Sequence, residues 1–178
     1  YATRSNVGGV AGKIYSTTAS LATSYTSLEN TGEIYMPQAD SLKCIAIGGV
    51  LGEVTIASVT MSDIKNSGAI KIENATNKGM YVSVGGILGR NFNDKFTSQK
   101  ITISSWNNSG DISVSENSGV RHIRAGGLIG DLLSSGSNKY EAVISMTNSR
   151  NSGDISRVTK AKGSSQSFAG GIIGGIGA

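Results

Sequence analysis

The feature of this sequence that most constrains its fold is a glycine motif that recurs five times. Each copy reads Gly-Gly-apolar-x-Gly, and the copies begin at Gly8, Gly48, Gly85, Gly126 and Gly170. A motif that returns every ~20–50 residues is typical of repeat architectures, in which each unit buries its apolar side chains against the next unit.

A second motif, Asn-Ser/Thr-Gly-x-Ile, lies between the glycine motifs and occurs four times, beginning at Asn30, Asn66, Asn108 and Asn151. From each Asn to the next Gly-Gly the distance is 18, 19, 18 and 19 residues, whereas from each Gly-Gly to the next Asn it is 22, 18, 23 and 25 residues. One half of the repeat therefore has a fixed length. The other half takes insertions, as expected of a scaffold with variable loops on one side.

Apolar residues around both motifs alternate with polar ones, which is the pattern of a half-buried strand. Val59 and Met61 alternate before the Asn turn, Ile70 and Ile72 after it, and the residues before Gly-Gly follow the same pattern. Each repeat is therefore predicted to hold three short strands. One enters the Asn turn, one leaves it, and one runs through the Gly-Gly motif.

A single repeat cannot bury its apolar row, but stacked repeats can, because Ile70 would lie between Ile34 and Ile112. We therefore predict an all-β fold, a parallel β-helix or β-solenoid of four to five coils, right-handed by the general preference of parallel crossovers. One repeat per coil is favoured because like residues then stack over like. Two coils per repeat, or a meander or sandwich, are the alternatives.

The sequence divides into approximate repeats that form one solenoid segment of a larger protein. They span residues 1–29, 30–65, 66–107, 108–150 and 151–178. Asn tolerates left-handed backbone angles and bonds its own backbone, and stacked Asn side chains can form a hydrogen-bonded ladder. Paired glycines allow a sharp bend or a close backbone contact. The positions with this structural role are Gly48, Gly49, Gly85, Gly86, Gly126, Gly127, Gly170, Gly171, Asn30, Asn66, Asn108 and Asn151.

Composition excludes several classes of protein. Charged residues are only 16% of the chain, and the formal charge of +4 is scattered without the basic clusters of a nucleic-acid platform. No apolar stretch reaches the ~18 residues of a membrane-spanning helix. The single cysteine, Cys44, cannot form an internal disulfide. The first residues carry no secretion signal, so we expect a signal outside this segment.

The residues that usually carry catalysis or bind metals are scarce. His122 is the one histidine, and it lies beside Arg121 and Arg124 without a nearby carboxylate in the sequence. With one His and one Cys, we predict no zinc site, no Cys/His nucleophile, no other metal site, no cofactor and no catalytic residue. His122 is interpreted as a strand or surface residue.

The acidic residues do not form the carboxylate cluster of a β-helical glycosidase or lyase. Glu33, Asp111 and Asp154 share one repeat position, with Ala69 in the remaining copy, and we expect them to face solvent at a turn. Asp131, which follows the fourth glycine motif, gives a weak likeness to calcium-binding nonapeptide repeats. Its counterparts in the other copies argue against calcium, and they are Lys13, Glu53, Arg90 and Gly175.

Aromatic residues fall into two groups. Trp106 occupies the position of Leu28 and Ile64 in other repeats, and we expect it to pack in the core. Two inserted loops carry aromatic and basic residues together, and they are the candidates for contact with a partner. Their residues are Phe92, Lys95, Phe96, Lys139 and Tyr140.

The repeats resemble the GLUG-motif family, named for its Gly-Leu-any-Gly core. The segment 126–130 (Gly-Gly-Leu-Ile-Gly) matches this core best, and the segment 101–112 resembles the family's Ile-x-x-x-x-Asn-x-Gly-x-Val stretch. The resemblance covers essentially the whole chain. The repeats here are longer than the family's short form, chiefly in loops such as 91–99 and 134–139, which leaves the strand boundaries open.

The resemblance implies secretion, a β-helical fold and a stalk or adhesive role, because such repeats are similar to those of large bacterial surface adhesins and immunoglobulin A peptidase-like proteins. We therefore expect a non-catalytic module at the bacterial cell surface or outside the cell. Its expected partners are a host glycan, a matrix protein or another copy stacked end to end, with no nucleic acid and no membrane insertion. The alternatives are a carbohydrate-active β-helix and a passive segment of a secreted peptidase.

Overall fold

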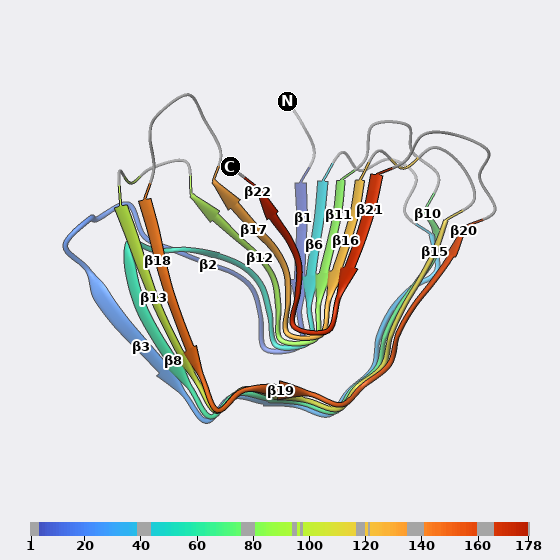
Figure 1. Ribbon diagram of the computed structural model, residues 1–178, viewed down its shortest axis with the longest axis horizontal. Coiled ribbons are helices and arrows are strands. Elements are labelled where there is room, and N and C mark those ends of the chain that lie inside the picture. Colours follow the sequence, from blue (N-terminus) through green and yellow to red (C-terminus); the bar gives the residue numbers. More distant parts are fainter. Residues whose placement is uncertain are drawn as a thin grey trace.

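The protein is all-β. The computed structural model describes residues 4–38, 44–75, 81–93, 96, 98–116, 120, 122–134, 141–159 and 166–177. Every regular element within these ranges is a strand, so none of the described segments is a helix that could cross a membrane. All strand pairs are parallel, and they form five sheets (Figure 1).

We number the sheets 1 to 5 in the order in which the chain visits them. Sheet 1 contains β1 (Arg4–Gly8), β6 (Cys44–Gly48), β11 (Tyr81–Gly85), β16 (His122–Gly126) and β21 (Gln166–Gly170). Sheet 2 contains β2 (Ala11–Tyr15), β7 (Leu51–Thr55), β12 (Leu88–Asn93), β17 (Ile129–Ser134) and β22 (Ile173–Gly177).

The remaining three sheets each have four strands. Sheet 3 contains β3 (Ala22–Thr26), β8 (Ser58–Ser62), β13 (Ser98–Ser104) and β18 (Glu141–Thr147). Sheet 4 contains β4 (Glu29–Asn30), β9 (Lys65–Asn66), β14 (Asn107–Asn108) and β19 (Arg150–Asn151). Sheet 5 contains β5 (Ile34–Met36), β10 (Ile70–Ala75), β15 (Ile112–Glu116) and β20 (Ile155–Thr159).

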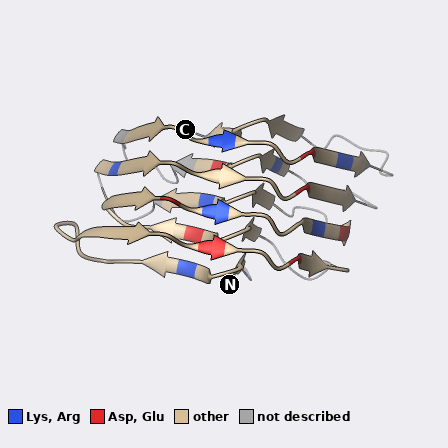
Figure 2. Ribbon diagram, turned by 90° about the horizontal axis from the view of Figure 1, so that it is seen from below, with Lys and Arg blue, Asp and Glu red and all other residues tan. Residues whose placement is uncertain are grey.

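The chain is a parallel β-solenoid with one sequence repeat per coil. Each strand from β1 to β17 pairs with the strand five elements later, so coil 1 is β1–β5 and coils 2, 3 and 4 follow in the same order. β21 and β22 begin a fifth coil, and Figure 2 shows the coils stacked on one another. Ile70 pairs with Ile34 on one side and Ile112 on the other, which confirms the predicted stacking of like residues.

Each coil has five strands rather than the three predicted. The Gly-Gly motif does not lie inside one strand: β6 ends at Gly48 and β7 begins at Leu51, with a bend between them. The Asn of the second motif forms a separate two-residue strand, as β9 does in coil 2. Paired glycines break the strand because they permit a turn too sharp for residues that carry a Cβ atom.

The bend gives each coil an indented outline. Sheets 1 and 2 form a narrow V whose apex is the Gly-Gly bend, and the V lies inside a wider curve made by sheets 3, 4 and 5 (Figure 1). The apex points toward sheet 4. Two separate hydrophobic cores therefore flank the V.

The first core lies between sheets 2 and 3. Its buried residues include Leu51, Leu88, Met61, Ile103 and Trp106, and Trp106 is 0% exposed, as predicted. The second core lies between sheets 1 and 5 and includes Ile45, Ile47, Val82, Ile72, Ile112 and Val114. At about 1.5–3 kcal/mol for each buried side chain before chain entropy is subtracted, these rows stabilise stacked coils where a single coil would be unstable.

The two arms of the V pack backbone against backbone. A Cβ atom added to Gly89 in sheet 2 would come within 2.6 Å of the amide nitrogen of Ile47 in sheet 1, and one added to Gly130 would come within 2.5 Å of the nitrogen of Val84. The third glycine of the motif is therefore needed so that the two sheets can approach this closely.

Candidate functional site

An asparagine ladder runs along the axis of the solenoid through sheet 4. Each ladder Asn donates from Nδ2 to the Oδ1 of the Asn in the next coil, at 2.8 Å from Asn30 to Asn66, 2.8 Å from Asn66 to Asn108 and 2.7 Å from Asn108 to Asn151. Each Nδ2 also donates to the carbonyl two residues later, at 2.8 Å in all four coils. The ladder predicted from the sequence is therefore present.

The ladder packs against the apex of the V. A Cβ atom on Gly86 would collide with Cγ of Asn108 and with the carbonyl oxygen of Gly127. Gly49 and Gly127 meet the ladder in the same way, at Asn66 and Asn151. The two sequence motifs, about 20 residues apart in the chain, thus form one structural joint between the two cores.

Each coil also has a strained residue three positions before its ladder Asn. These residues have positive φ without being glycine: Ser27 (56°), Asp63 (52°), Ser105 (58°) and Asn148 (50°). Small polar side chains tolerate the left-handed region better than bulky ones. This turn places the two-residue strand of sheet 4 at an angle to sheet 3.

A column of alternating charges fills the V, one residue from each coil. In sheet 2, Lys13 pairs in register with Glu53, Glu53 with Arg90, and Arg90 with Asp131. We call these four residues the charge ladder. Lys13 Nζ lies 2.8 Å from Glu53 Oε1, and Arg90 Nε donates to Glu53 Oε2 at 2.7 Å, while Arg90 Nη2 contacts the same carboxylate oxygen.

The opposite arm of the V is shaped to fit the charge ladder. Arg124 of sheet 1 donates from Nη1 to Asp131 Oδ1 at 2.5 Å, and its aliphatic stem occupies the space that a side chain at Gly175 would need. Ser83 Oγ lies 3.5 Å from Asp131 Oδ2. Glu53, Arg90 and Asp131 are at most 2% exposed, so the buried charges are paired, as buried charges must be.

The two acids of the ladder respond differently to burial. Burial works to raise the pKa of the Glu53 carboxyl, but Arg90 and Lys13 together hold that pKa below its usual value. For Asp131, burial outweighs the effects of Arg124, Arg90 and Ser83, and its pKa is raised. The carboxylate with two close cationic partners is therefore the more firmly ionised one.

Cys44 and Phe92 lie beside the charge ladder. Arg90 Nη1 lies 2.7 Å from Cys44 Sγ, so one guanidinium contacts both the thiol and the Glu53 carboxylate. The guanidinium carbons of Arg4 and Arg90 lie 4.8 Å and 4.9 Å from the centroid of the Phe92 ring. The ring thereby covers the charge ladder and contributes cation–π contacts.

Phe92 therefore does not lie in a partner-binding loop, as the sequence analysis expected. It belongs to β12 and is only 7% exposed. Asn91 and Gln99 also lie in strands, where Asn91 Nδ2 donates to Gln99 Oε1 at 2.7 Å and Gln99 Nε2 donates to Asn91 Oδ1 at 3.0 Å. The connection between β12 and β13 is shorter than the 91–99 segment, because both flanking strands are longer than the apolar alternation indicated.

The other predicted loop residues are placed only in part. Phe96 is half-buried, and Lys95, Lys139 and Tyr140 lie outside the described residues. His122 is the first residue of β16, and its ring stacks on Tyr81 at a centroid distance of 4.7 Å. Glu33, Asp111 and Asp154 are exposed at the turn before sheet 5, as expected.

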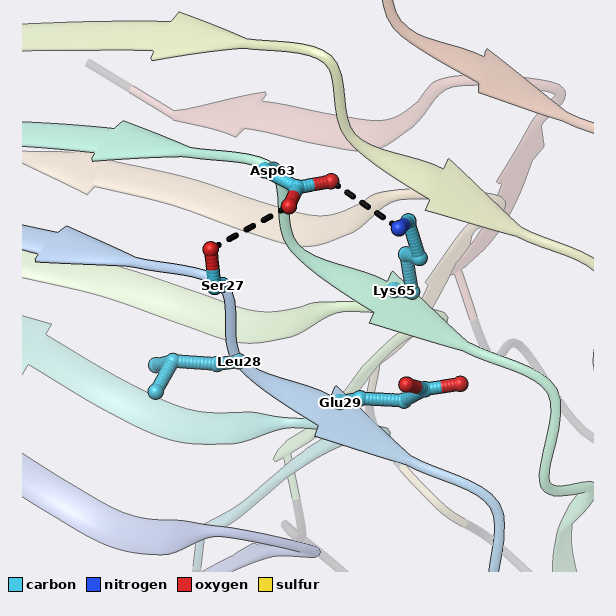
Figure 3. A pocket seen from close by; sticks show the side chains of 5 residues that line it. All are labelled: Ser27, Leu28, Glu29, Asp63 and Lys65. Atoms are coloured by element: carbon cyan, nitrogen blue, oxygen red, sulfur yellow. Dashed lines mark hydrogen bonds and ion pairs between the residues drawn. The ribbon is translucent and has the colours of Figure 1, made fainter.

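A shallow depression of about 190 Å³ lies on the outer surface between coils 1 and 2 (Figure 3). Ser27, Leu28, Glu29, Asp63 and Lys65 line it. Asp63 accepts a hydrogen bond from Ser27 at 3.2 Å and pairs with Lys65 at 3.1 Å, and these two contacts lower its pKa. The polar groups in the depression thus bond one another across the two coils.

Sequence reasoning missed the charge ladder, although its residues were compared position by position. The charge at this repeat position alternates in sign from one copy to the next: Lys13, Glu53, Arg90 and Asp131. The ladder could have been predicted from this alternation. Stacked coils make such residues neighbours, so the alternation itself indicates a column of ion pairs.

Within the described part of the chain, no three His, Cys, Asp or Glu side chains form a set that could hold a metal ion. The chain matches no protein-family model, no curated protein and no solved structure.

Proposed function

We propose that this chain is a non-catalytic repeat module of a bacterial cell-surface or secreted protein, which acts as a rigid stalk or scaffold and presents adhesive loops. The observation that supports this most directly is the continuity of the interior. The asparagine ladder joins coils 1 to 4 by hydrogen bonds, and the residues of the charge ladder lie in register through the same coils.

Such an interior suits a load-bearing rod. Coils 1 to 4 are bonded to one another by backbone hydrogen bonds in five sheets and by the amide ladder, and coils 1 to 3 also by the ion pairs of Glu53 with Lys13 and Arg90. In the V, Arg90 contacts Cys44 and Asp131 pairs with Arg124, so these buried side chains join the two arms. The resemblance of the repeats to the GLUG motif of bacterial surface adhesins supports the same assignment.

The loop-bearing side is the place where we expect adhesion. The connections from sheet 2 to sheet 3 and from sheet 5 to sheet 1 vary in length between coils. Variable loops on a rigid scaffold are a common arrangement for binding. The scaffold would hold such loops at the coil spacing, and host glycans or matrix proteins are the proposed partners.

The test is binding of the purified chain to arrays of glycans and matrix proteins. In one variant, residues 94–97 are replaced by Gly and Ser of equal length, which leaves the Asn91–Gln99 pair intact. In the control variant, residues 39–42 are replaced in the same way. Saturable binding that is lost only in the first variant would place adhesion on the connection between β12 and β13.

Absence of binding to any array, together with resistance of the rod to proteolysis, would favour a stalk without adhesion. Turnover of a polysaccharide by the purified chain would contradict the proposal, because a stalk needs no active site. It would favour the carbohydrate-active alternative.

A further inference from the structure

The outer face of sheet 3 carries a regular two-dimensional array of hydroxyl groups. Two adjacent ranks hold only serine and threonine, one residue from each of β3, β8, β13 and β18. The first rank is Ser24, Thr60, Thr102 and Ser145, and the second is Thr26, Ser62, Ser104 and Thr147.

The inward-facing side chains of the same four strands hold the array rigid. Residues alternate across a strand, so the neighbours of these hydroxyl residues point inward, and Val59, Met61, Ile101 and Ile103 are at most 1% exposed in the first core. The three strand pairs run in register without a bulge, and the four strands lie side by side on one flank of the molecule (Figure 1). The hydroxyl positions therefore repeat from coil to coil.

These hydroxyl groups are not used to hold the fold. Among the described residues, the one hydrogen bond to any of the eight side-chain oxygens is a 3.5 Å contact between Thr26 and Ser27. Serines elsewhere in the described chain do bond, as Ser149 does to the carbonyl of Thr147 at 2.8 Å. A side-chain hydroxyl offers one donor and two acceptor sites, so the array presents many unoccupied sites to solvent.

The two ranks also carry no charge. Figure 2 shows the strands of sheet 3 almost entirely without acidic or basic residues, and Lys100, the cation on β13, belongs to the next rank. An uncharged face has no electrostatic preference for a charged polymer. The ranks also hold no aromatic ring on which a sugar could stack, so a neutral polysaccharide is disfavoured as the ligand.

The spacing of the array favours an ordered lattice of water. Neighbouring strands lie about 4.8 Å apart, and alternate residues along a strand lie about 6.7 Å apart. Water oxygens on a prism face of hexagonal ice repeat in a rectangular grid with two spacings close to these. We propose that the outer face of sheet 3 binds ice.

Binding of this kind depends on preorganisation. An isolated hydroxyl group gains little free energy by binding ice, because its hydrogen bond to ice only replaces one to liquid water. Eight hydroxyl groups fixed on a rigid sheet order the waters between them at little further entropic cost, and those waters join the lattice. This inference does not rest on adhesion to glycans or matrix proteins.

The test is incorporation of the purified chain into a slowly growing ice hemisphere, together with inhibition of ice recrystallisation. Thr60→Tyr and Thr102→Tyr place a bulky ring in the centre of the array. The matched control is Ser113→Tyr, which puts the same ring on the outer face of sheet 5. We expect wild type and S113Y to enter the ice and T60Y and T102Y to fall to the level of a non-binding protein. Circular dichroism verifies the fold of each.

A second variant tests the same face by gain of function. Ser62→Thr, Ser104→Thr and Ser145→Thr together add methyl groups at exposed or half-buried positions and should increase inhibition of recrystallisation. Absence of the wild-type chain from the ice, or equal loss of incorporation in S113Y, would overturn the proposal. Neither result bears on the glycan and matrix arrays, so the two functions fail independently.

Discussion

At the scale of single residues, the decisive positions are those whose side chains bond the coils on both sides. Asn108 is 0% exposed, accepts from Asn66 and donates to Asn151 and to the Gly110 carbonyl. No other side chain of this length offers an acceptor and two donors at one end. This explains why the same residue type recurs at the position in all four repeats.

Replacing Asn108 with alanine is expected to cost about 2–4 kcal/mol of unfolding free energy, because it leaves the amides of Asn66 and Asn151 and one buried carbonyl without their partner. Asn30→Ala is the matched control. Asn30 is half-buried and bonds a ladder neighbour on one side only, so about 1 kcal/mol is expected. Urea unfolding followed by Trp106 fluorescence measures both, and equal losses would show that the ladder bonds contribute little.

Glu53 predicts how stability depends on pH. Its folded pKa lies below the usual value, so its contribution is present above the unfolded pKa and is lost as pH falls through the folded pKa. Glu53→Gln should destabilise the protein by about 3 kcal/mol at neutral pH, since it leaves Arg90 without its carboxylate. The difference from wild type should narrow as the pH falls through the folded pKa of Glu53.

Asp131 supplies the contrasting control for that experiment. Its folded pKa is raised, so the contribution of Asp131 is greatest when the carboxyl is protonated and falls as pH rises through the folded pKa. Asp131→Asn should therefore have the stability of wild type at acidic pH and should be the more stable of the two at neutral pH, which is the opposite direction to E53Q. Urea unfolding at several pH values measures both, and a gap for E53Q that widens on acidification would contradict the assignment of its pKa.

Much of this residue-scale chemistry could be predicted from the sequence, but unevenly. The Asn ladder followed from four Asn residues at one repeat position, since like residues stack in a solenoid. The charge ladder was missed because its members differ from copy to copy, so a search for repeated identities passes over Lys13, Glu53, Arg90 and Asp131. Complementary residues in stacked coils are as informative as identical ones.

At the scale of elements, the Gly-Gly bend determines how the sheets meet. In the first four copies of the motif the second glycine lies against the asparagine ladder, and the third glycine lets sheets 1 and 2 touch through their backbones. The bend therefore both turns the chain and sets the distance between the two cores.

Gly86→Ala is expected to destabilise the protein by about 1–3 kcal/mol or more, because its Cβ atom would lie well inside 3.0 Å of the Gly127 carbonyl oxygen and of the Asn108 side chain. Gly171→Ala is the matched control at the same repeat position in the fifth coil. A Cβ atom there meets nothing within 4 Å. Thermal unfolding of the two variants measures the effect, and a loss of the same size in G171A would show that backbone freedom, and not the contact, is what matters.

The elements themselves were predicted more coarsely than the fold. Alternation at Val82 and Val84 located β11, but it could not show that the strand stops at Gly85, because Ile87 and Leu88 continue the apolar run beyond the bend. In the same way, the polar residues Asn91 and Gln99 indicated a loop, whereas their amides satisfy each other inside the first core. A local pattern of polar and apolar residues does not reveal a buried polar pair, since the two hydrogen-bonded side chains lie on different strands.

At the scale of the whole molecule, we expect the charge ladder to restrict which coils can be neighbours. Similar repeats risk stacking in the wrong order, because the glycine motif and the ladder Asn recur from coil to coil and do not distinguish one neighbour from another. Alternating charges remove this freedom: Glu53 is attracted to Lys13 and Arg90 in the adjacent coils but would repel Asp131, two coils away. Unpaired or like charges in a buried position are costly, so a skipped coil is disfavoured.

Deletion of residues 86–126 tests this directly, because it removes one repeat and joins Gly85 to Gly127, which preserves the sequence of both motifs. The shortened chain should keep its parallel sheets and its asparagine ladder, with Asn66 next to Asn151. Its charge ladder, however, would place Asp131 beside Glu53. We expect a loss of stability well beyond that from the missing coil, measured by urea unfolding.

Asp131→Arg in the deleted chain distinguishes charge from length. It restores an arginine beside Glu53, where Arg90 lies in the full chain and contacts both Glu53 and Cys44. The repaired chain should recover about 3 kcal/mol relative to the deletion alone, whereas the same substitution in the full chain should destabilise it by opposing Arg90 and Arg124. If D131R changes the unfolding free energy by the same amount in both chains, the charge ladder does not specify the order of the coils. The matching of coils then depends on the cores alone.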